Sequence, residues 1–200
     1  AVNLKKKPEV NLEIEFKLMQ KSGNRYTTGI EYDVYKRLLG ELPKKYKQHS
    51  VLKTIDRKIG PFRQTLDVET GYKTYMKKDK IVVNGADDIK PLTNTVSYIG
   101  VKCALASEHS IIKSSQIKKL DDLFGNTNAN YTREKTRISF VADKYRLDLT
   151  HVTNQDVYEF EIELLSSNFG KVDVSALTYS LNSILYTISK MFASVGSKLD

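Results

Sequence analysis

The sequence has little cysteine and no long apolar run, and each shortage excludes a class of protein. Its single cysteine, Cys103, cannot form a disulfide within the chain, which excludes a secreted scaffold held by disulfides. No apolar stretch approaches the ~18 residues of a membrane-spanning helix. Because no signal peptide is recognisable either, we expect an intracellular protein without a membrane partner.

Short motifs for metal, phosphate or covalent chemistry are also missing. The histidines His49, His109 and His151 lie far apart, so a zinc site is not predicted. Neither a P-loop motif nor a Gly-x-Gly-x-x-Gly motif after a strand occurs. No Ser, Cys or His arrangement has the spacing of a covalent nucleophile. We therefore expect any chemistry to come from carboxylates, metal and water.

The charge balance is basic. The 200 residues include 32 Lys and Arg against 24 Asp and Glu, a formal charge of +8 with a pI near 9.3. This balance favours an anionic partner such as nucleic acid, nucleotide or polyphosphate. No internal repeat or linker divides the chain, so we expect one domain over residues 1–200, with residues 1–9 as a flexible lead-in.

Alternating and helical patterns predict an α+β domain. Thr28 and Glu31 have the spacing of a capping box for a helix that Pro43 ends, and Gly125 closes a second helix that begins at Ser114 or Ser115. An amphipathic helix is predicted over residues 173–193. Strands are predicted at residues 10–19, 94–108, 131–141, 144–152 and 157–165, with a hairpin at residues 62–80 around Gly71.

The predicted strands carry charged residues on alternate positions, and both signs occur. Successive side chains of a strand point to opposite faces, so each of these sets lies on one face. The sets are Arg133, Lys135 and Arg137, then Arg146 and Asp148, then Glu159, Glu161 and Glu163. Two arrangements fit: an open sheet with its charged face in water, or a closed barrel with its charged face inside.

The positions of the glutamates help to choose between the open sheet and the closed barrel. Glu13 and Glu15 lie near the start of the chain and the Glu159–Glu163 triplet lies far along it, so the two groups would meet if the first and last strands were neighbours. Carboxylates suit Mg²⁺ or Mn²⁺, and a divalent ion would relieve their repulsion. The basic strands would then face the metal and leave room for a triphosphate. From the residues alone, a solvent-exposed charged face remains equally open.

Four segments in this order carry a family resemblance: NLEIEFKL, REKTRISF, YRLDLTHV and YEFEIEL. Together they resemble the metal-dependent mRNA 5′-triphosphatases of fungi, protozoa and DNA viruses, in the triphosphate tunnel metalloenzyme superfamily. The likeness is greatest to the triphosphatase domain of giant-virus, mimivirus-like mRNA capping enzymes, and it covers residues 10–165. It implies a mainly antiparallel α+β fold: a closed eight-stranded β-barrel with a charged interior and flanking helices.

The resemblance also implies roles for individual residues. Glu13, Glu15 and Glu163 would bind the metal. Glu108 would activate the attacking water, with Glu159 and Glu161 beside the metal, and Asp148 would support a basic neighbour. The implied phosphate-binding residues are Arg63, Lys78, Lys135, Arg137 and Arg146. Lys78 is preferred to Lys77 if Asp67 pairs with Tyr72 across the hairpin turn. Lys17 completes a Glu-x-Glu-x-Lys pattern of other tunnel enzymes.

The implied activity is removal of the γ-phosphate from triphosphate-ended RNA with Mg²⁺ or Mn²⁺, the first step of mRNA capping, together with NTP hydrolysis. The domain would be the N-terminal part of a longer enzyme, with guanylyltransferase and methyltransferase domains following, and if viral it would act in the host cytoplasm or the virion. Two alternatives remain. One is a tunnel phosphatase acting on tripolyphosphate or nucleotides, and the other is a non-catalytic RNA-binding module.

Overall fold

Strands make up most of the molecule. The structure is a computed structural model, and it describes residues 10–83, 90–93, 96–165 and 173–193; the predicted lead-in, residues 1–9, lies outside this part. The strands are β1 (Val10–Ser22), β2 (Arg25–Thr28), β3 (Lys47–Ile59), β4 (Phe62–Asp67), β5 (Lys73–Val83), β6 (Lys90–Thr93), β7 (Val96–Ser110), β8 (Tyr131–Ala142), β9 (Tyr145–Val152) and β10 (Val157–Leu164). The helices are α1 (Tyr32–Lys45), α2 (Ser114–Asn126) and α3 (Val174–Ala193).

The sheet closes on itself. Its strand order is β2-β1-β10-β9-β8-β3-β4-β5-β7-β6, and β1 also pairs with β7. Eight strands, from β1 through β10, β9, β8, β3, β4 and β5 to β7, therefore form a closed antiparallel barrel, with β2 and β6 added to it. The predicted fold class is confirmed. The predicted meeting of first and last strands is confirmed as well, because Glu15 lies opposite Glu163.

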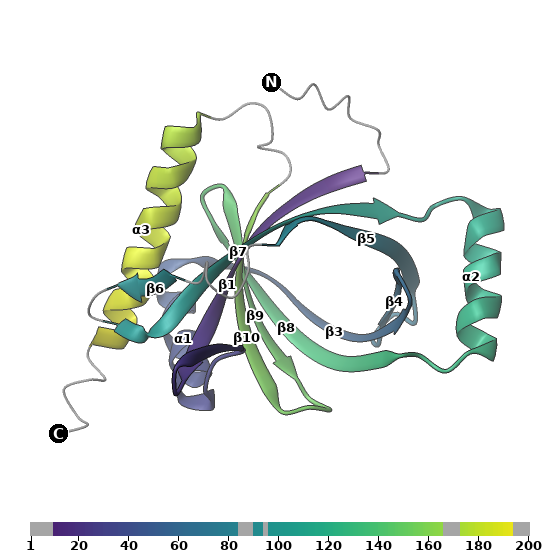
Figure 1. Cartoon of the computed structure of the whole chain (residues 1–200), viewed down its shortest axis with the longest axis horizontal. Coiled ribbons are helices and arrows are strands. Elements are labelled where there is room, and N and C mark those ends of the chain that lie inside the picture. Colours follow the sequence, from purple (N-terminus) through teal and green to yellow (C-terminus); the bar gives the residue numbers. More distant parts are fainter. Residues whose placement is uncertain (1–9, 84–89, 94–95, 166–172, 194–200) are drawn as a thin grey trace.

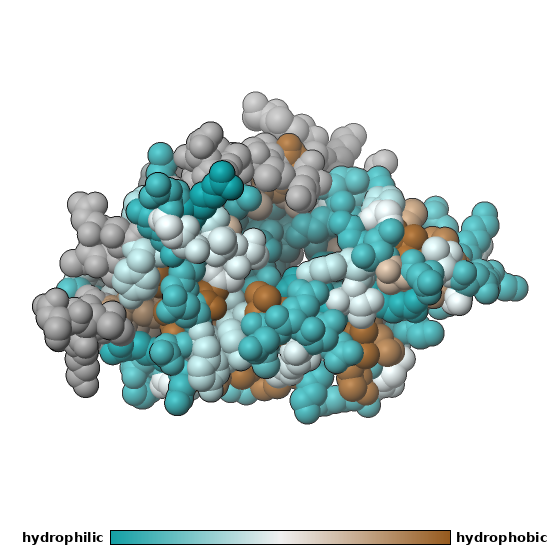
Figure 2. Space-filling model, turned by 60° about the horizontal axis from the view of Figure 1, so that its bottom comes forward, coloured by the Kyte–Doolittle hydropathy of each residue, from teal (hydrophilic) through white to brown (hydrophobic). Residues whose placement is uncertain are grey.

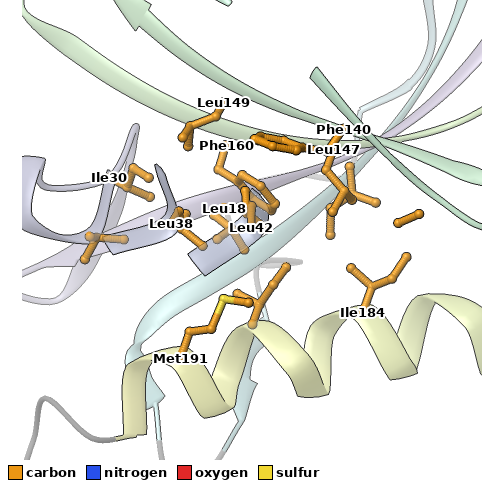
Figure 3. Close-up of a cluster of buried hydrophobic side chains, with 14 of the residues drawn as sticks. Leu18, Ile30, Leu38, Leu42, Phe140, Leu147, Leu149, Phe160, Ile184 and Met191 are labelled. Carbon is orange, nitrogen blue, oxygen red and sulfur yellow. The ribbon is translucent and has the colours of Figure 1, made fainter. Parts of the chain in front are cut away.

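The apolar side chains of β1, β9 and β10 face outward and form the main core with α1 and α3. Figure 1 shows both helices on one side of the barrel. Leu147, Leu149 and Phe160 are fully buried there, against Leu38 from α1 and other side chains from α3 (Figure 3). Burying one such side chain stabilises the fold by about 1.5–3 kcal/mol. Since alternate residues face opposite ways, this packing directs the charged residues of the same strands into the barrel.

A smaller cluster holds α2 at the opposite end of the molecule (Figure 1). Tyr75 of β5, Leu120 and Phe124 are buried there, with Ile59 and Phe62 packed around them. Arg57 lies over the Phe124 ring, 5.8 Å from its centroid. The α2 side therefore has an outer covering of its own, much smaller than that under α1 and α3.

Three predicted helix signals are wrong. The residue that precedes α1 is Glu31, with no side-chain cap, because Thr28 belongs to β2. Pro43 does not end α1, which continues to Lys45; in the last turn a proline gives up only one hydrogen bond. Gly125 lies within α2, which ends at Asn126.

The face of the molecule in Figure 2 is mainly polar. Figure 2 shows hydrophilic side chains over most of one face, with hydrophobic side chains in small separate patches. Among the described helices, none is both long and apolar enough to cross a membrane.

Candidate functional site

The interior of the barrel is lined by ion pairs that connect strands which are not neighbours in the sheet. Arg63 of β4 contacts Glu108 of β7, with 3.3 Å between Nη2 and Oε1. Arg133 of β8 contacts Glu159 of β10 at 2.6 Å. In each case one strand lies between the two, so both side chains share the inner face. The predicted closed barrel with a charged interior therefore matches the structure better than an exposed charged face.

A carboxylate group occupies one wall. Glu13 and Glu15 share the inner face of β1, because the alternate residues Ile14 and Phe16 pack against the outer core. Glu163 of β10 lies opposite Glu15. The ammonium of Lys78 pairs with Glu13 and lies 3.9 Å from Glu15. The three predicted metal ligands are thus neighbours, with a lysine among them.

The central hairpin supplies the basic side chains of the facing wall. The amide of Asp67 donates to the carbonyl of Tyr72, which is the predicted turn register. Arg63 then lies opposite Met76, and Lys78, two residues on, shares their face. The Lys78 ammonium lies 3.5 Å from the Glu108 carboxylate, which Arg63 also contacts. Glu108 lies within β7 and not in a loop after it.

Asp148 organises the arginines of β8 and β9. It is almost completely buried, and its carboxylate accepts bonds from Ser139 Oγ at 2.7 Å and Arg146 Nε at 2.9 Å. Arg137 Nη1 lies 3.3 Å from the other oxygen. Arg146 also pairs with Glu163. This geometry agrees with the supporting part predicted for Asp148, because it fixes two guanidinium groups at once.

Glu161 stays ionised because cations surround it. Burial alone would raise its pKa, but Lys17, at 2.5 Å, and Arg137, at 3.8 Å, outweigh burial and lower the pKa to about 2. Glu161 in turn raises the pKa of Lys17. Lys17, which completes the Glu-x-Glu-x-Lys pattern, is therefore part of the interior charge network.

Glu163 and Glu15 have the opposite tendency. Burial raises the pKa of Glu163 to about 7 despite Arg146, and the carboxylates of Glu13, Asp148 and Glu108 add to this rise. Burial also raises the pKa of Glu15, against the effect of Lys17. Burial is thus the main reason why the ionised forms of these two carboxylates are disfavoured, and an added cation would lower their energy.

Two interior residues had no assigned role from the sequence. Asp56 of β3 accepts a hydrogen bond from Thr65 at 2.8 Å and pairs with Lys135, whose side chain is nearly buried. Its strand was not recognised, because exposed residues on both faces of β3 hide any alternation. Arg133 belongs to the alternating charged set of its strand, but the sequence assigned it no role. Its ion pair with Glu159 places it in the site.

The predicted metal ligands have the right chemistry for a divalent ion, but their carboxylates are not arranged around a common metal position. Glu13, Glu15 and Glu163 offer hard oxygen donors, and burial raises the pKa of Glu15 and Glu163, so that a bound cation would favour their ionised forms. Among the described residues, however, no three acidic side chains converge closely enough to hold a metal. Instead, Lys78 forms an ion pair with Glu13, and Arg146 forms one with Glu163. The predicted metal set remains a prediction.

Comparison with known proteins gives a structural relative. No family model matches the chain, and no curated protein matches it in sequence. The structure of the S. pombe Pct1 RNA triphosphatase matches with a TM-score of 0.59 and 14% identity, over 92% of this chain and 83% of that chain. The same enzyme in complex with the Spt5 CTD matches with the same values. The chain has the triphosphate tunnel fold. A protein from Pyrococcus horikoshii also matches, with a TM-score of 0.46 and 15% identity, over 88% of this chain and 89% of that chain.

The triphosphate tunnel fold accounts for the placement of all the predicted site residues. Their twelve side chains come from seven strands of the barrel and share its inner face by register. The likeness to Pct1 establishes this fold, while the roles of individual residues remain predictions.

Proposed function

We propose that this chain is a polynucleotide 5′-triphosphatase, which removes the γ-phosphate from triphosphate-ended RNA and leaves a diphosphate end, the first step of mRNA capping. The supporting observation is a closed barrel with the fold of an RNA triphosphatase, lined by cations on some walls and by buried carboxylates on others. Free NTPs are proposed as further substrates with Mn²⁺.

Glu13, Glu15 and Glu163 would hold the Mg²⁺ or Mn²⁺ ion. The ion supplies charge stabilisation for the transferring phosphoryl group. For this to happen, Lys78 and Arg146 must exchange their carboxylate partners for substrate oxygens. The interior is therefore self-neutralised without substrate, and its cations turn to the phosphates when substrate and metal arrive together.

Arg63, Lys135 and Arg137 would neutralise phosphate oxygens from the wall facing the carboxylates. Asp148 holds Arg137 and Asp56 holds Lys135 in place, and both acids are almost completely buried. Such preorganised donors stabilise the charge that develops in phosphoryl transfer, because they need little rearrangement during the reaction.

Three further glutamates have proposed roles around the reacting phosphate. Glu108 would orient the attacking water, since it lies between Arg63 and Lys78. Glu161, with a pKa of about 2, remains an anion at any working pH and would position Lys17 and metal-bound water. Glu159 would position Arg133.

A second candidate function is hydrolysis of inorganic tripolyphosphate or nucleotides without dedication to RNA. The position of Lys17 favours it, because the Glu-x-Glu-x-Lys pattern of that branch lies inside the barrel. Comparing phosphate release from triphosphate-ended RNA with Mg²⁺ and from ATP with Mn²⁺ distinguishes the two. A non-catalytic RNA-binding module would bind RNA in a salt-dependent way without needing metal or Glu13.

The wider biological setting belongs to the same proposal. We propose that guanylyltransferase and methyltransferase domains follow in the full-length protein, that the enzyme is of the giant-virus type, and that it acts in the host cytoplasm or the virion.

The decisive experiment replaces one metal ligand at a time. Glu13→Ala and Glu163→Ala should each lower phosphate release from triphosphate-ended RNA by at least ~10²-fold, because each removes a charge needed in the transition state. Glu134→Ala, an exposed glutamate on the outer face of β8, is the matched control and should keep full activity. Circular dichroism checks that all variants fold. Wild-type activity in either site variant would refute the metal assignment.

A further inference from the structure

The two ends of the barrel differ in charge. We call them the Tyr131 end, where β8 begins, and the Val141 end, where it finishes. Because neighbouring strands are antiparallel, β3 and β1 finish at the Tyr131 end and β7 begins there. The same end can therefore be followed from strand to strand around the barrel.

Charge changes sign along three strands in the same direction. On the inner face of β1, β3 and β7, a lysine comes at the Tyr131 end and a carboxylate follows toward the Val141 end. The lysines are Lys17, Lys58 and Lys102, and the carboxylates are Glu13, Asp56 and Glu108. Along these three strands the inner face therefore changes from a lysine at the Tyr131 end to a carboxylate on the side of the proposed metal ligands, while on β10 Glu159 lies toward the Tyr131 end and pairs with Arg133.

Several cations at the Tyr131 end face other cations across the sheet, although Lys17 also pairs with Glu161, Arg63 with Glu108 and Arg133 with Glu159. Lys17 lies directly opposite Lys102, and Lys58 lies directly opposite Arg63. Like charges that face each other across a sheet destabilise it. Within the described part of the chain, neither Lys58 nor Lys102 has an ion-pair partner, and the buried Nε of Arg133 has no hydrogen-bond acceptor. An anion at this end would relieve each of these costs.

An aromatic ring stands beside these cations. Tyr131 is directly opposite Lys58 and on the inner-face parity of Arg133, and 45% of its surface is exposed. Its hydroxyl donates to Gln155 at 3.2 Å, which holds the ring at the rim. Aromatic rings next to cations are the usual means by which proteins bind single-stranded nucleic acid, through base stacking and phosphate contacts.

The spacing suits a nucleic acid that continues out of the barrel. Arg137 and Tyr131 are six residues apart on β8, which is ~20 Å at 3.3 Å per residue. With a strand tilt of ~40°, this corresponds to ~15 Å along the barrel axis. That span is longer than a triphosphate, so the first nucleotide of a bound RNA reaches the rim.

From these observations we infer that RNA leaves the barrel by the Tyr131 end: its γ-phosphate lies at the carboxylate wall, its first base stacks on Tyr131, and Lys58 and Lys102 contact the following phosphates. This inference rests on the proposed function and deepens it. It names the residues that distinguish an RNA end from free tripolyphosphate.

The test compares substrates in matched variants. For the wild type, Tyr131→Ala, the double variant Lys58→Ala/Lys102→Ala, and Lys47→Ala, kcat/KM is measured with a triphosphate-ended RNA of about ten nucleotides and with inorganic tripolyphosphate. The ratio of RNA to tripolyphosphate should fall about 10-fold in the first two variants, since each stacked base is worth ~1–3 kcal/mol and each phosphate contact adds to affinity. Lys47 lies on β3 at the opposite end, and its variant should keep the ratio.

A second readout does not depend on any variant folding. RNA with 4-thiouridine at its first or second position, bound to the wild type in EDTA and irradiated, should crosslink to the peptide around Tyr131. Crosslinking at the Val141 end, or an unchanged substrate ratio in both Tyr131-end variants, overturns the inference while the proposed function stands. If the wild type releases phosphate from tripolyphosphate but not from RNA, the proposed function fails, and this inference fails with it.

Discussion

The two faces of strand β10 have opposite effects on the stability of the fold. Phe160, Ile162 and Leu164 face outward and are buried with α1 and α3. Glu159 and Glu161 face inward, where they pair with cations from other strands. The outer face stabilises the fold, whereas the inner face contains charges whose burial costs free energy. Substitutions on one strand, one residue apart, should therefore separate stability from activity.

The largest effect should come from the outer face. Phe160→Ala removes a fully buried ring and should lower the free energy of unfolding by about 3–5 kcal/mol, measured by urea denaturation. The fraction that remains folded should keep its kcat, because no interior charge changes. A loss of kcat with normal stability would contradict the separation of the two faces.

A smaller effect of opposite sign should come from the inner face. The folded-state pKa of Glu163, about 7, lies above its ordinary value, so the folded protein holds this proton more tightly than the unfolded chain does. Stability of the metal-free protein therefore falls as pH rises toward 7, and it remains lowered above 7. Glu163→Gln should raise the free energy of unfolding at pH 8 in EDTA by about 1–2 kcal/mol.

Thermal unfolding at pH 5 and pH 8 checks this prediction. At pH 5 the wild type and Glu163→Gln should unfold at nearly the same temperature, because the carboxyl is protonated in the folded protein. At pH 8, Mg²⁺ or Mn²⁺ should stabilise the wild type more than the variant. A variant less stable than the wild type at pH 8 in EDTA would argue against a raised pKa of Glu163 in the folded protein.

The smallest effect should come from the outer face under α2. The Tyr75 hydroxyl donates to Asp121 and accepts a bond from Gln64 at 2.7 Å. Tyr75→Phe leaves the buried Gln64 amide without its acceptor and should lower the free energy of unfolding by about 1 kcal/mol. Urea denaturation measures the change, with Tyr72→Phe at an exposed position as the control. Equal effects for both variants would mean that the cluster under α2 contributes little.

Much of the barrel could be predicted from the sequence because alternation reports directly on two faces. The segments around Glu13, Arg137, Asp148 and Glu161 alternate strictly, and all four are interior residues of barrel strands. The turn between Asp67 and Tyr72 also fixed the face of Lys78 correctly. Such predictions succeed where one face is apolar along its whole length.

Other features could not be predicted, because they depend on tertiary neighbours. Strand β3 is exposed on both faces over its first half, so its sequence did not indicate that Asp56 faces the interior. Only the ion pair with Lys135 in the structure shows this. The Thr28 to Glu31 spacing fitted a capping box, but pairing with β1 drew Thr28 into β2. The charge difference between the two ends required the register of all the strands, which no single segment contains.

Closure of the barrel has a kinetic consequence. Lys17 and Glu161, which meet across the β1–β10 seam, are 144 positions apart in the chain. During synthesis β1 can pair with β7 first, but its other edge stays open until β10 emerges from the ribosome. Pairing across such a separation is slow, and an open edge invites aggregation. We expect pairing of β1 with β10 to limit the folding rate. Slower elongation before β10 would therefore prolong the time during which the edge of β1 is unpaired.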